Sequence, residues 1–201
     1  MNSFLRSYSG LVLALATLLP SSRVCAEDDA RTQLRSGVVG GAALLGTPDV
    51  GAGLAFDLGA RLELNTTHAF SFRVGYGVLV GDRETQDRWW ILASYGAQLA
   101  LDRGLRLELG GGLGAGAVSG YENLEAFIAA PFDPHWAYQL LPAVTAHARL
   151  WMDDGPHASW FVGAELGGLV DVPGLGVREG NAHQASDLMW LTLSVGTAFW
   201  P

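Results

Sequence analysis

Residues 105–117 read Leu-Arg-Leu-Glu-Leu-Gly-Gly-Gly-Leu-Gly-Ala-Gly-Ala, and this stretch decides the fold class. Its leucines stand at every second position of the first half, with arginine, glutamate and glycine between them. In an extended strand, side chains two positions apart point to the same face. The stretch therefore predicts a strand with one apolar face and one face that is small or charged.

The same period-two alternation recurs in seven further segments of the chain. Phe56 and Leu58, for example, alternate with Asp57 and Gly59. The seven segments are Gly37–Leu45, Gly51–Leu64, His68–Val80, Trp89–Leu101, Tyr138–Met152, Trp160–Val172 and Leu188–Trp200. The facing of the first segment is ambiguous, whereas the others have a clear apolar face. The pattern predicts eight strands.

The connections between these segments alternate in length. The tight, turn-rich joints are Asn65–Thr67, Asp102–Gly104 and Asp153–Pro156. The connections at the other end are Gly81–Arg88, Val118–Ala137 and Pro173–Asp187, together with the short Thr47–Val50. Short turns at one end and longer loops at the other predict an all-β fold. We expect an eight-stranded antiparallel up-and-down barrel with both termini at the short-turn end.

The N-terminus has the layout of an export signal. One positive charge in Met1–Arg6 is followed by the apolar run Leu11–Leu19 and by small residues at Val24–Ala26. This is the arrangement of a cleaved secretory signal peptide. We expect a signal peptide at residues 1–26 and one barrel domain at residues 27–201. Cleavage would remove Cys25, the only cysteine, so we expect no disulfide.

The composition indicates which face of the barrel meets lipid. Hydrophobic residues make up 49% of the chain, yet no segment after the signal peptide has the roughly eighteen unbroken apolar residues of a membrane helix. If the apolar face of each strand meets lipid and the small or charged face lines the interior, both faces are in a suitable environment. We therefore expect a transmembrane barrel that contacts outer-membrane lipid. The net charge of −8 disfavours nucleic acid as a partner.

These features resemble the small outer-membrane barrels typified by outer-membrane proteins A, X and W. In the last segment, alternate apolar residues ending in an aromatic resemble the C-terminal signal read by the barrel assembly machinery; they are Leu191, Leu193, Val195 and Phe199. The chain departs from that signal in carrying Trp200 and Pro201 beyond the aromatic, and Thr197 where an aromatic is common. The resemblance implies location in the bacterial outer membrane and assembly by that machinery.

Inward-facing charged and polar residues gather near the short turns. The residues concerned are Arg61, Glu63, Arg73, Gln98, Arg106, Glu108, His147 and Arg149. Mixed charges in a narrow lumen should pair, because an unpaired buried charge is very costly. The interior of an eight-stranded barrel holds only side chains or one small ligand. We therefore expect a salt-bridged plug and no wide aqueous pore.

The other half of the lumen is rich in inward glycines, with several large apolar side chains between them. These side chains are Trp90, Leu92, Leu141, Leu169 and Trp190. One interpretation is a roomy chamber that binds a small hydrophobic molecule. The other is that the large side chains fill the space above the glycines, since tight interiors are the rule.

The loop at residues 119–136 is unusually apolar for a surface segment. Leu124, Phe127 and Ile128 have helical spacing ahead of Pro131 and Pro134. The segment is predicted to form a lid, to lie in the lipid headgroup layer, to contact a partner, or to pack on the rim as a short amphipathic turn.

No motif points to catalysis, to a metal or to a cofactor. A lipid deacylase of this size would need a histidine–serine pair on the lipid-facing surface, whereas the outward faces are almost devoid of polar residues. The five histidines have no ligand spacing. We expect a non-enzymatic barrel with a structural or interaction role in the cell envelope. The alternative is binding or transport of a small hydrophobic molecule.

Overall fold

The computed structural model describes residues 34–47, 51–82, 84–102, 104–131, 133–134, 136–170, 178–179 and 188–201. The predicted signal peptide and most of the predicted Pro173–Asp187 loop lie outside these residues. About four fifths of the described residues are in β-strands.

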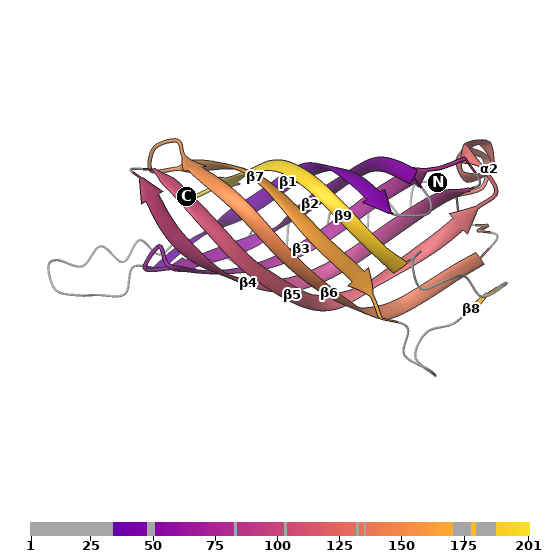
Figure 1. Ribbon diagram of the computed structural model, residues 1–201, viewed down its shortest axis with the longest axis horizontal. Coiled ribbons are helices and arrows are strands. Elements are labelled where there is room, and N and C mark those ends of the chain that lie inside the picture. Colours follow the sequence, from indigo (N-terminus) through magenta and orange to yellow (C-terminus); the bar gives the residue numbers. More distant parts are fainter. Residues whose placement is uncertain are drawn as a thin grey trace, which may run out of the picture.

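Eight long strands close into one barrel (Figure 1). They are β1 (Leu34–Thr47), β2 (Gly51–Leu64), β3 (His68–Val80), β4 (Thr85–Asp102), β5 (Leu105–Tyr121), β6 (Trp136–Asp153), β7 (Ala158–Leu169) and β9 (Met189–Phe199). Each pairs antiparallel with its neighbours along the chain, and β1 pairs with β9 to close the ring. The prediction of an eight-stranded up-and-down barrel is confirmed. A two-residue strand, β8 (Arg178–Glu179), pairs with the start of β6.

Short turns define one end of the barrel, which we call the inner end. Asn65 and Thr66 join β2 to β3 with φ of 52° and 56°, the pair of positive values that a type I′ hairpin turn requires. Gly104 and Gly155 supply φ of 78° and 79° in the other two turns. The C-terminus lies at this end in Figure 1, opposite helix α2 (Leu124–Ala129), which marks the outer end.

Three strands are longer at the outer end than the alternation predicted. β4 begins at Thr85, β5 ends at Tyr121 and β6 begins at Trp136, so the predicted loop bounds Gly81–Arg88 and Val118–Ala137 are wrong. Backbone pairing continues as far as Val80↔Thr85 and Thr85↔Tyr121. The extension was missed because these strand ends no longer alternate between apolar and polar residues.

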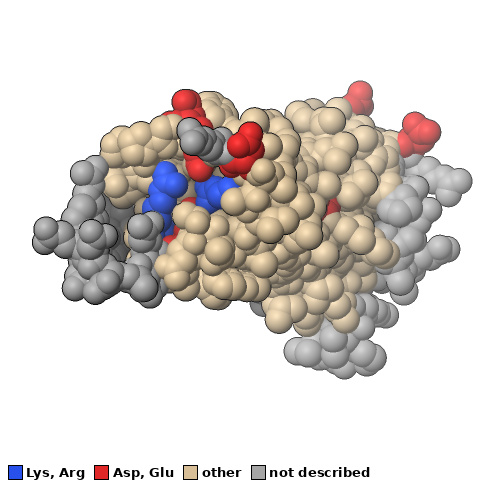
Figure 2. All heavy atoms as spheres, turned by 60° about the vertical axis from the view of Figure 1, so that its left-hand side comes forward, with Lys and Arg blue, Asp and Glu red and all other residues tan. Residues whose placement is uncertain are grey.

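The outer wall is apolar over the height of every long strand. Leu113 is 69% exposed and Leu193 is 57% exposed. Each of the eight long strands carries large apolar side chains that are exposed in this way. Figure 2 shows the face of the wall in view as an almost unbroken tan surface, with most of the visible charged atoms towards the two ends. β9 has 11 residues, and a tilted strand of about nine to eleven residues crosses a bilayer. Apolar surface of this extent is suited to contact with hydrocarbon.

The facing of β1, ambiguous in sequence, is settled by burial. Val39 and Leu45 are buried in the lumen, whereas Leu44 is exposed on the wall. The inward face of β1 is therefore the face that carries Arg35, Val39 and Leu45. Among the described residues, no helix has the length and apolar character needed to cross a membrane.

Candidate functional site

A chain of ion pairs begins at the inner end of the lumen. Arg106 donates to Asp153 Oδ1 at 2.8 Å and to Glu63 Oε2 at 3.1 Å. Arg61, two residues before Glu63 on the same face of β2, donates to Glu63 Oε1 from Nε at 3.0 Å and from Nη2 at 2.9 Å. Carboxylates therefore stand on both sides of Arg106, and Glu63 bridges two guanidinium groups.

Glu108 continues the chain towards the middle of the barrel. Arg61 donates to Glu108 Oε2 through its Nη2, and Arg149 reaches Glu108 Oε1 at 3.3 Å. His147 Nε2 lies 3.1 Å from the same oxygen, and Gln98 donates to Oε2 at 3.0 Å. With four partners from β2, β4 and β6, Glu108 is the junction of the network.

Two arginines and two carboxylates complete the chain near mid-barrel. Arg149 donates to Glu165 Oε2 at 3.2 Å, and Arg73 contacts the same oxygen. Arg73 also donates to Asp57 Oδ2 at 2.7 Å. The complete sequence of contacts is Asp153, Arg106, Glu63, Arg61, Glu108, Arg149, Glu165, Arg73 and Asp57, and we call these nine residues the charge chain.

Charges alternate in sign along the charge chain. The charge chain contains five carboxylates and four arginines. A fifth arginine, Arg35, approaches Glu63 to 4.0 Å. The two signs therefore balance. Buried charge is tolerated where it is paired and hydrogen-bonded, and an unbalanced lumen of this width would be strongly unfavourable. Arg61 also lies over the Trp151 ring at 4.2 Å, which adds a cation–π contact.

The structure brings together all the inward charged residues predicted from sequence, and it adds four that the prediction left out. The additions are Arg35, Asp57, Asp153 and Glu165. Alternation along β2 already placed Asp57 on the inward face with Arg61 and Glu63. Its height next to Arg73 depends on the register Gly59↔Arg73, which the sequence alone does not show. The ion pairs consequently reach further from the short turns than predicted.

The five predicted chamber residues also lie together, in the outer half of the lumen. Trp90, Leu92, Leu141, Leu169 and Trp190 are each 7% exposed or less. They belong to one buried apolar group, which we call the outer cluster, with Leu45, Ala55, Leu79, Val118, Ala143 and Leu188. The outer cluster lies beyond the charge chain towards the outer end.

Indole rings occupy the space above two of the glycines. A Cβ on Gly75 would lie 2.2 Å from the Trp90 ring, and a Cβ on Gly167 would lie 2.2 Å from the Trp190 ring. Each glycine pairs directly with its tryptophan across the ladder, and the two rings stack at 6.0 Å. In this structure the outer half of the lumen is packed with side chains. Binding of a hydrophobic ligand there remains a prediction.

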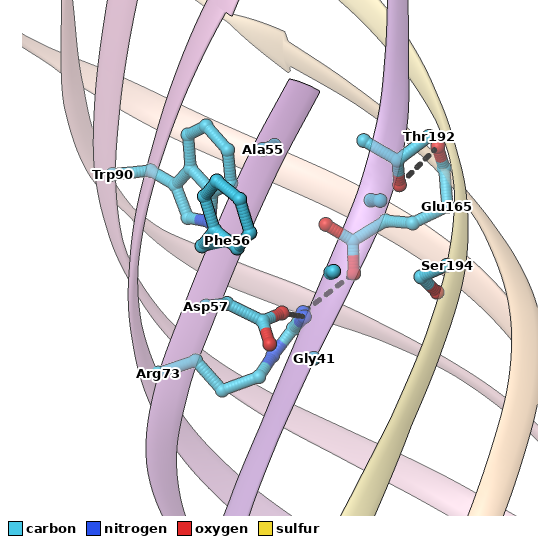
Figure 3. Close-up of a pocket in the computed structure, with 11 residues that line it drawn as sticks. Gly41, Ala55, Phe56, Asp57, Arg73, Trp90, Glu165, Thr192 and Ser194 are labelled. Carbon is cyan, nitrogen blue, oxygen red and sulfur yellow. Dashed lines mark hydrogen bonds and ion pairs between the residues drawn. The ribbon is translucent and has the colours of Figure 1, made fainter.

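A small cavity lies where the two layers meet (Figure 3). Asp57, Arg73 and Glu165 line it from the charge chain, and Trp90 and Thr192 also contribute. Its volume is about 10 Å³, close to the minimum that one water molecule occupies. It is far too small for the hydrophobic ligand considered in the sequence analysis.

Helix α2 packs on the outer rim. The Asn123 side chain caps it by accepting from Ala126 N at 2.8 Å, and Phe127 meets the Tyr121 ring edge-on at 5.1 Å. No residue of the helix is buried, and Leu124 and Ile128 are exposed. Several interpretations were open for the loop at residues 119–136. The contacts of α2 agree with a short helical turn packed on the rim, and the helix does not enter the lumen.

A polar pair lies on the outward face, which the sequence predicts to be almost devoid of polar residues. His68 Nδ1 and Tyr95 Oη are 2.7 Å apart near the inner end, and both side chains are exposed. No serine hydroxyl contacts His68 in the described hydrogen bonds. Among the described residues, no group of three or more histidine, cysteine, aspartate or glutamate side chains could hold a metal ion.

No known family model and no curated protein sequence match the chain. Solved structures do match its fold. Neisserial surface protein A has a TM-score of 0.56 and 13% identity, over 84% of this chain and 98% of that one. A major outer membrane protein from Thermus thermophilus gives 0.53 and 13%, over 84% and 100%. Ail, the attachment invasion locus protein of Yersinia pestis, gives 0.52 and 12%, over 83% and 98%. The chain therefore has the closed eight-stranded fold of these outer-membrane barrels.

Replacement of Glu108 by glutamine tests the junction of the charge chain. Glu108→Gln keeps the shape of the side chain but leaves Arg61 and Arg149 short of one buried negative charge. Removing one partner of a buried ion pair costs about 3–5 kcal/mol. We expect a loss of about that size in the free energy of unfolding, measured by urea titration of the protein in lipid vesicles. Glu125→Gln on exposed α2 is the control and should change it by less than about 0.5 kcal/mol. Equal stability of the two variants would contradict the account.

A size exchange tests the packing of the outer cluster. Gly75→Val should destabilise the barrel, because the new side chain overlaps the Trp90 ring. In the double variant with Trp90→Ala, part of the lost stability should return, a coupling of about 0.5–3 kcal/mol between neighbouring sites. Gly46→Val is the control, since the nearest atom to its Cβ lies at 3.8 Å. Simple additivity of the Gly75 and Trp90 changes in urea unfolding would show that the two residues are not in contact.

Proposed function

We propose that the protein is an outer-membrane barrel of the bacterial envelope that works through its outer end, in a structural or interaction role. The observation that carries the proposal is a lumen filled by two successive layers, the charge chain and the outer cluster. A filled lumen disfavours transport, so the groups available to other molecules are those on the wall and at the two ends.

The wall supports the membrane location. Exposed large apolar residues occur on every long strand, and exposure of such an area to water would be strongly unfavourable. The fold is shared with outer-membrane proteins of three bacterial groups. Export by a cleaved signal peptide and insertion by the barrel assembly machinery are part of this proposal.

The outer end supports an interaction role. β4, β5 and β6 have 17 or 18 residues, compared with 11 in β9, so this side of the barrel extends beyond the opposite side. These taller strands carry α2, with Leu124 and Ile128 exposed at its surface. A raised rim with an exposed apolar turn is a surface suited to contact with another envelope component.

Charge restricts the class of partner. At the outer end, we consider the connection between β3 and β4 and the connection between β5 and β6. Among their described residues, the exposed charged side chains are all acidic; they are Asp82, Glu122, Glu125 and Asp133. One structure with this fold is Ail in complex with the heparin analogue sucrose octasulfate, at 11% identity and a TM-score of 0.50. These four acidic side chains repel a polysulfated ligand, so we do not extend that kind of ligand to this chain.

Binding of a small hydrophobic molecule is the second candidate. It requires the stacked Trp90 and Trp190 rings to separate, because the outer cluster is packed. The structure favours the first candidate, in which the outer cluster is structural. We also propose that the barrel is not an enzyme, in line with the absence of a recognisable catalytic motif in the sequence.

Single cysteines test the location and the orientation together. The only natural cysteine is Cys25, in the predicted signal peptide. Glu125→Cys lies on α2 at the outer end, and Asp154→Cys lies in the turn between β6 and β7 at the inner end. With a membrane-impermeant maleimide on intact cells, we expect labelling of Glu125→Cys only. Asp154→Cys should be labelled once the outer membrane is permeabilised.

Leu113→Cys, in the middle of the wall, is the matched control and should stay unlabelled in both conditions because lipid covers it. Labelling of Asp154→Cys and not Glu125→Cys on intact cells would reverse the orientation. Labelling of all three in a soluble fraction would overturn the membrane location.

A further inference from the structure

The chain continues past the last strand and turns one more side chain into the lumen. Phe199 is outward and 58% exposed, whereas Trp200 is inward and only 3% exposed. The Trp200 ring joins a small buried apolar group at the inner end, which contains Val39, Trp151, Phe161 and Ala198. The residue that departs from the usual C-terminal signal is thus part of the folded interior.

Three hydrogen bonds tie Trp200 to the end of the β6–β7 turn and the start of β7. Its backbone N–H donates to His157 O at 2.9 Å, and His157 Nδ1 lies 3.1 Å from Trp200 O. Its indole Nε1 donates to Ser159 Oγ at 3.1 Å. Ser159 in turn donates to Asp153, the first residue of the charge chain, at 2.8 Å. Every polar group of Trp200 therefore has a partner on the β6–β7 side.

Arg35 of β1 meets Trp200 from the other side. Its guanidinium carbon lies 4.1 Å from the centre of the Trp200 ring, and its Nη2 donates to Pro156 O at 2.9 Å. Gly37 makes room for this arrangement, since a Cβ there would lie 2.7 Å from the indole and 2.2 Å from Phe199 O. Arg35 thus connects β1 to the β6–β7 turn across the end of β9.

This connection bridges the shortest ladder of the ring. β1 and β9 form the seam between the first and last strands, and their ladder runs only from Val38↔Phe199 to Gly46↔Leu191. Every other neighbouring pair of long strands has a longer ladder; β1 pairs with β2 along its whole length, from Leu34 to Thr47. The first four residues of β1 therefore have no β9 partner in the ladder, and Arg35 and Trp200 lie where the ladder stops.

We propose that Arg35, His157, Ser159 and Trp200 form a clasp that fastens the barrel seam at its inner end. Trp200 is held by β7 and the turn before it, and Arg35 reaches the Trp200 ring and Pro156 O only when β1 lies in register beside β9. The clasp is therefore complete only in the closed ring, and it opposes separation of these two strands. The residue beyond the aromatic at position 199 thereby has a role in the closed barrel. This inference rests on the fold and does not depend on the proposed interaction role.

Hydrogen exchange on protein purified in detergent from cells expressing the full chain tests the clasp. In Trp200→Ala, we expect the amides of the β1–β9 ladder to exchange about tenfold faster, through loss of the cation–π contact and the indole hydrogen bond. Amides of the β2–β3 ladder should keep their rates. Trp200→Phe retains the ring over Arg35 but has no Nε1 donor, so it should give an intermediate rate at the seam.

Trp160→Ala is the matched control, because this tryptophan lies at the same end on the outward face of β7. It should leave the exchange at the seam unchanged. If Trp200→Ala yields no folded protein, Arg35→Gln keeps the chain end intact and should accelerate exchange at the same seam amides by a smaller factor.

Three results would overturn the clasp. One is an unchanged seam in both Trp200→Ala and Arg35→Gln. Another is an equal increase in exchange in the β1–β9 and β2–β3 ladders, which indicates general loss of packing. The third is a low yield of Trp200→Ala in membranes with wild-type exchange in the protein recovered, which assigns Trp200 to recognition during assembly.

Discussion

Pairing of charge inside a narrow lumen is the constraint on which the rest of this structure depends. Asp57, Glu63, Glu108, Asp153 and Glu165 are joined through arginines that come from β1, β3, β5 and β6 as well as from β2. Arg61 and Glu63 pair within β2, and each of the other pairs is satisfied only if the strands hold their relative heights around the ring. The ion pairs therefore select one register for the barrel, while the backbone ladders supply its continuity.

A filled interior shifts the functional question to the surfaces. The charge chain occupies the inner half of the lumen and the outer cluster occupies the outer half, so the apolar wall can face hydrocarbon without a polar channel behind it. The asymmetry of the two ends follows from strand length. Short turns and the clasp keep the inner end compact, whereas β4, β5 and β6 raise the outer rim and hold α2 above it.

Alternation in the sequence was sufficient to predict the eight strands and most of the inward charged residues, because period two reports the face of each side chain directly. It was not sufficient to predict the position of each side chain along the barrel axis. Whether Asp57 meets Arg73, or whether the Trp90 ring lies over Gly75, depends on register between strands. Because register was unknown, the outer half of the lumen was open to two interpretations. One was a chamber for a ligand, and the other was a space filled by the large side chains. Trp200 was noted only as a departure, since its partners Arg35 and His157 are far away in sequence.

The most direct test of the account is the gel mobility of the membrane-fraction protein with and without boiling in detergent. A closed barrel keeps its ladder hydrogen bonds internal, and here the charged residues are paired inside it, so the folded form should resist detergent at room temperature. The account predicts a compact band in the outer-membrane fraction that shifts on boiling. A single unchanged mobility, with the protein in the soluble periplasm, would contradict a barrel with lipid outside and charge inside.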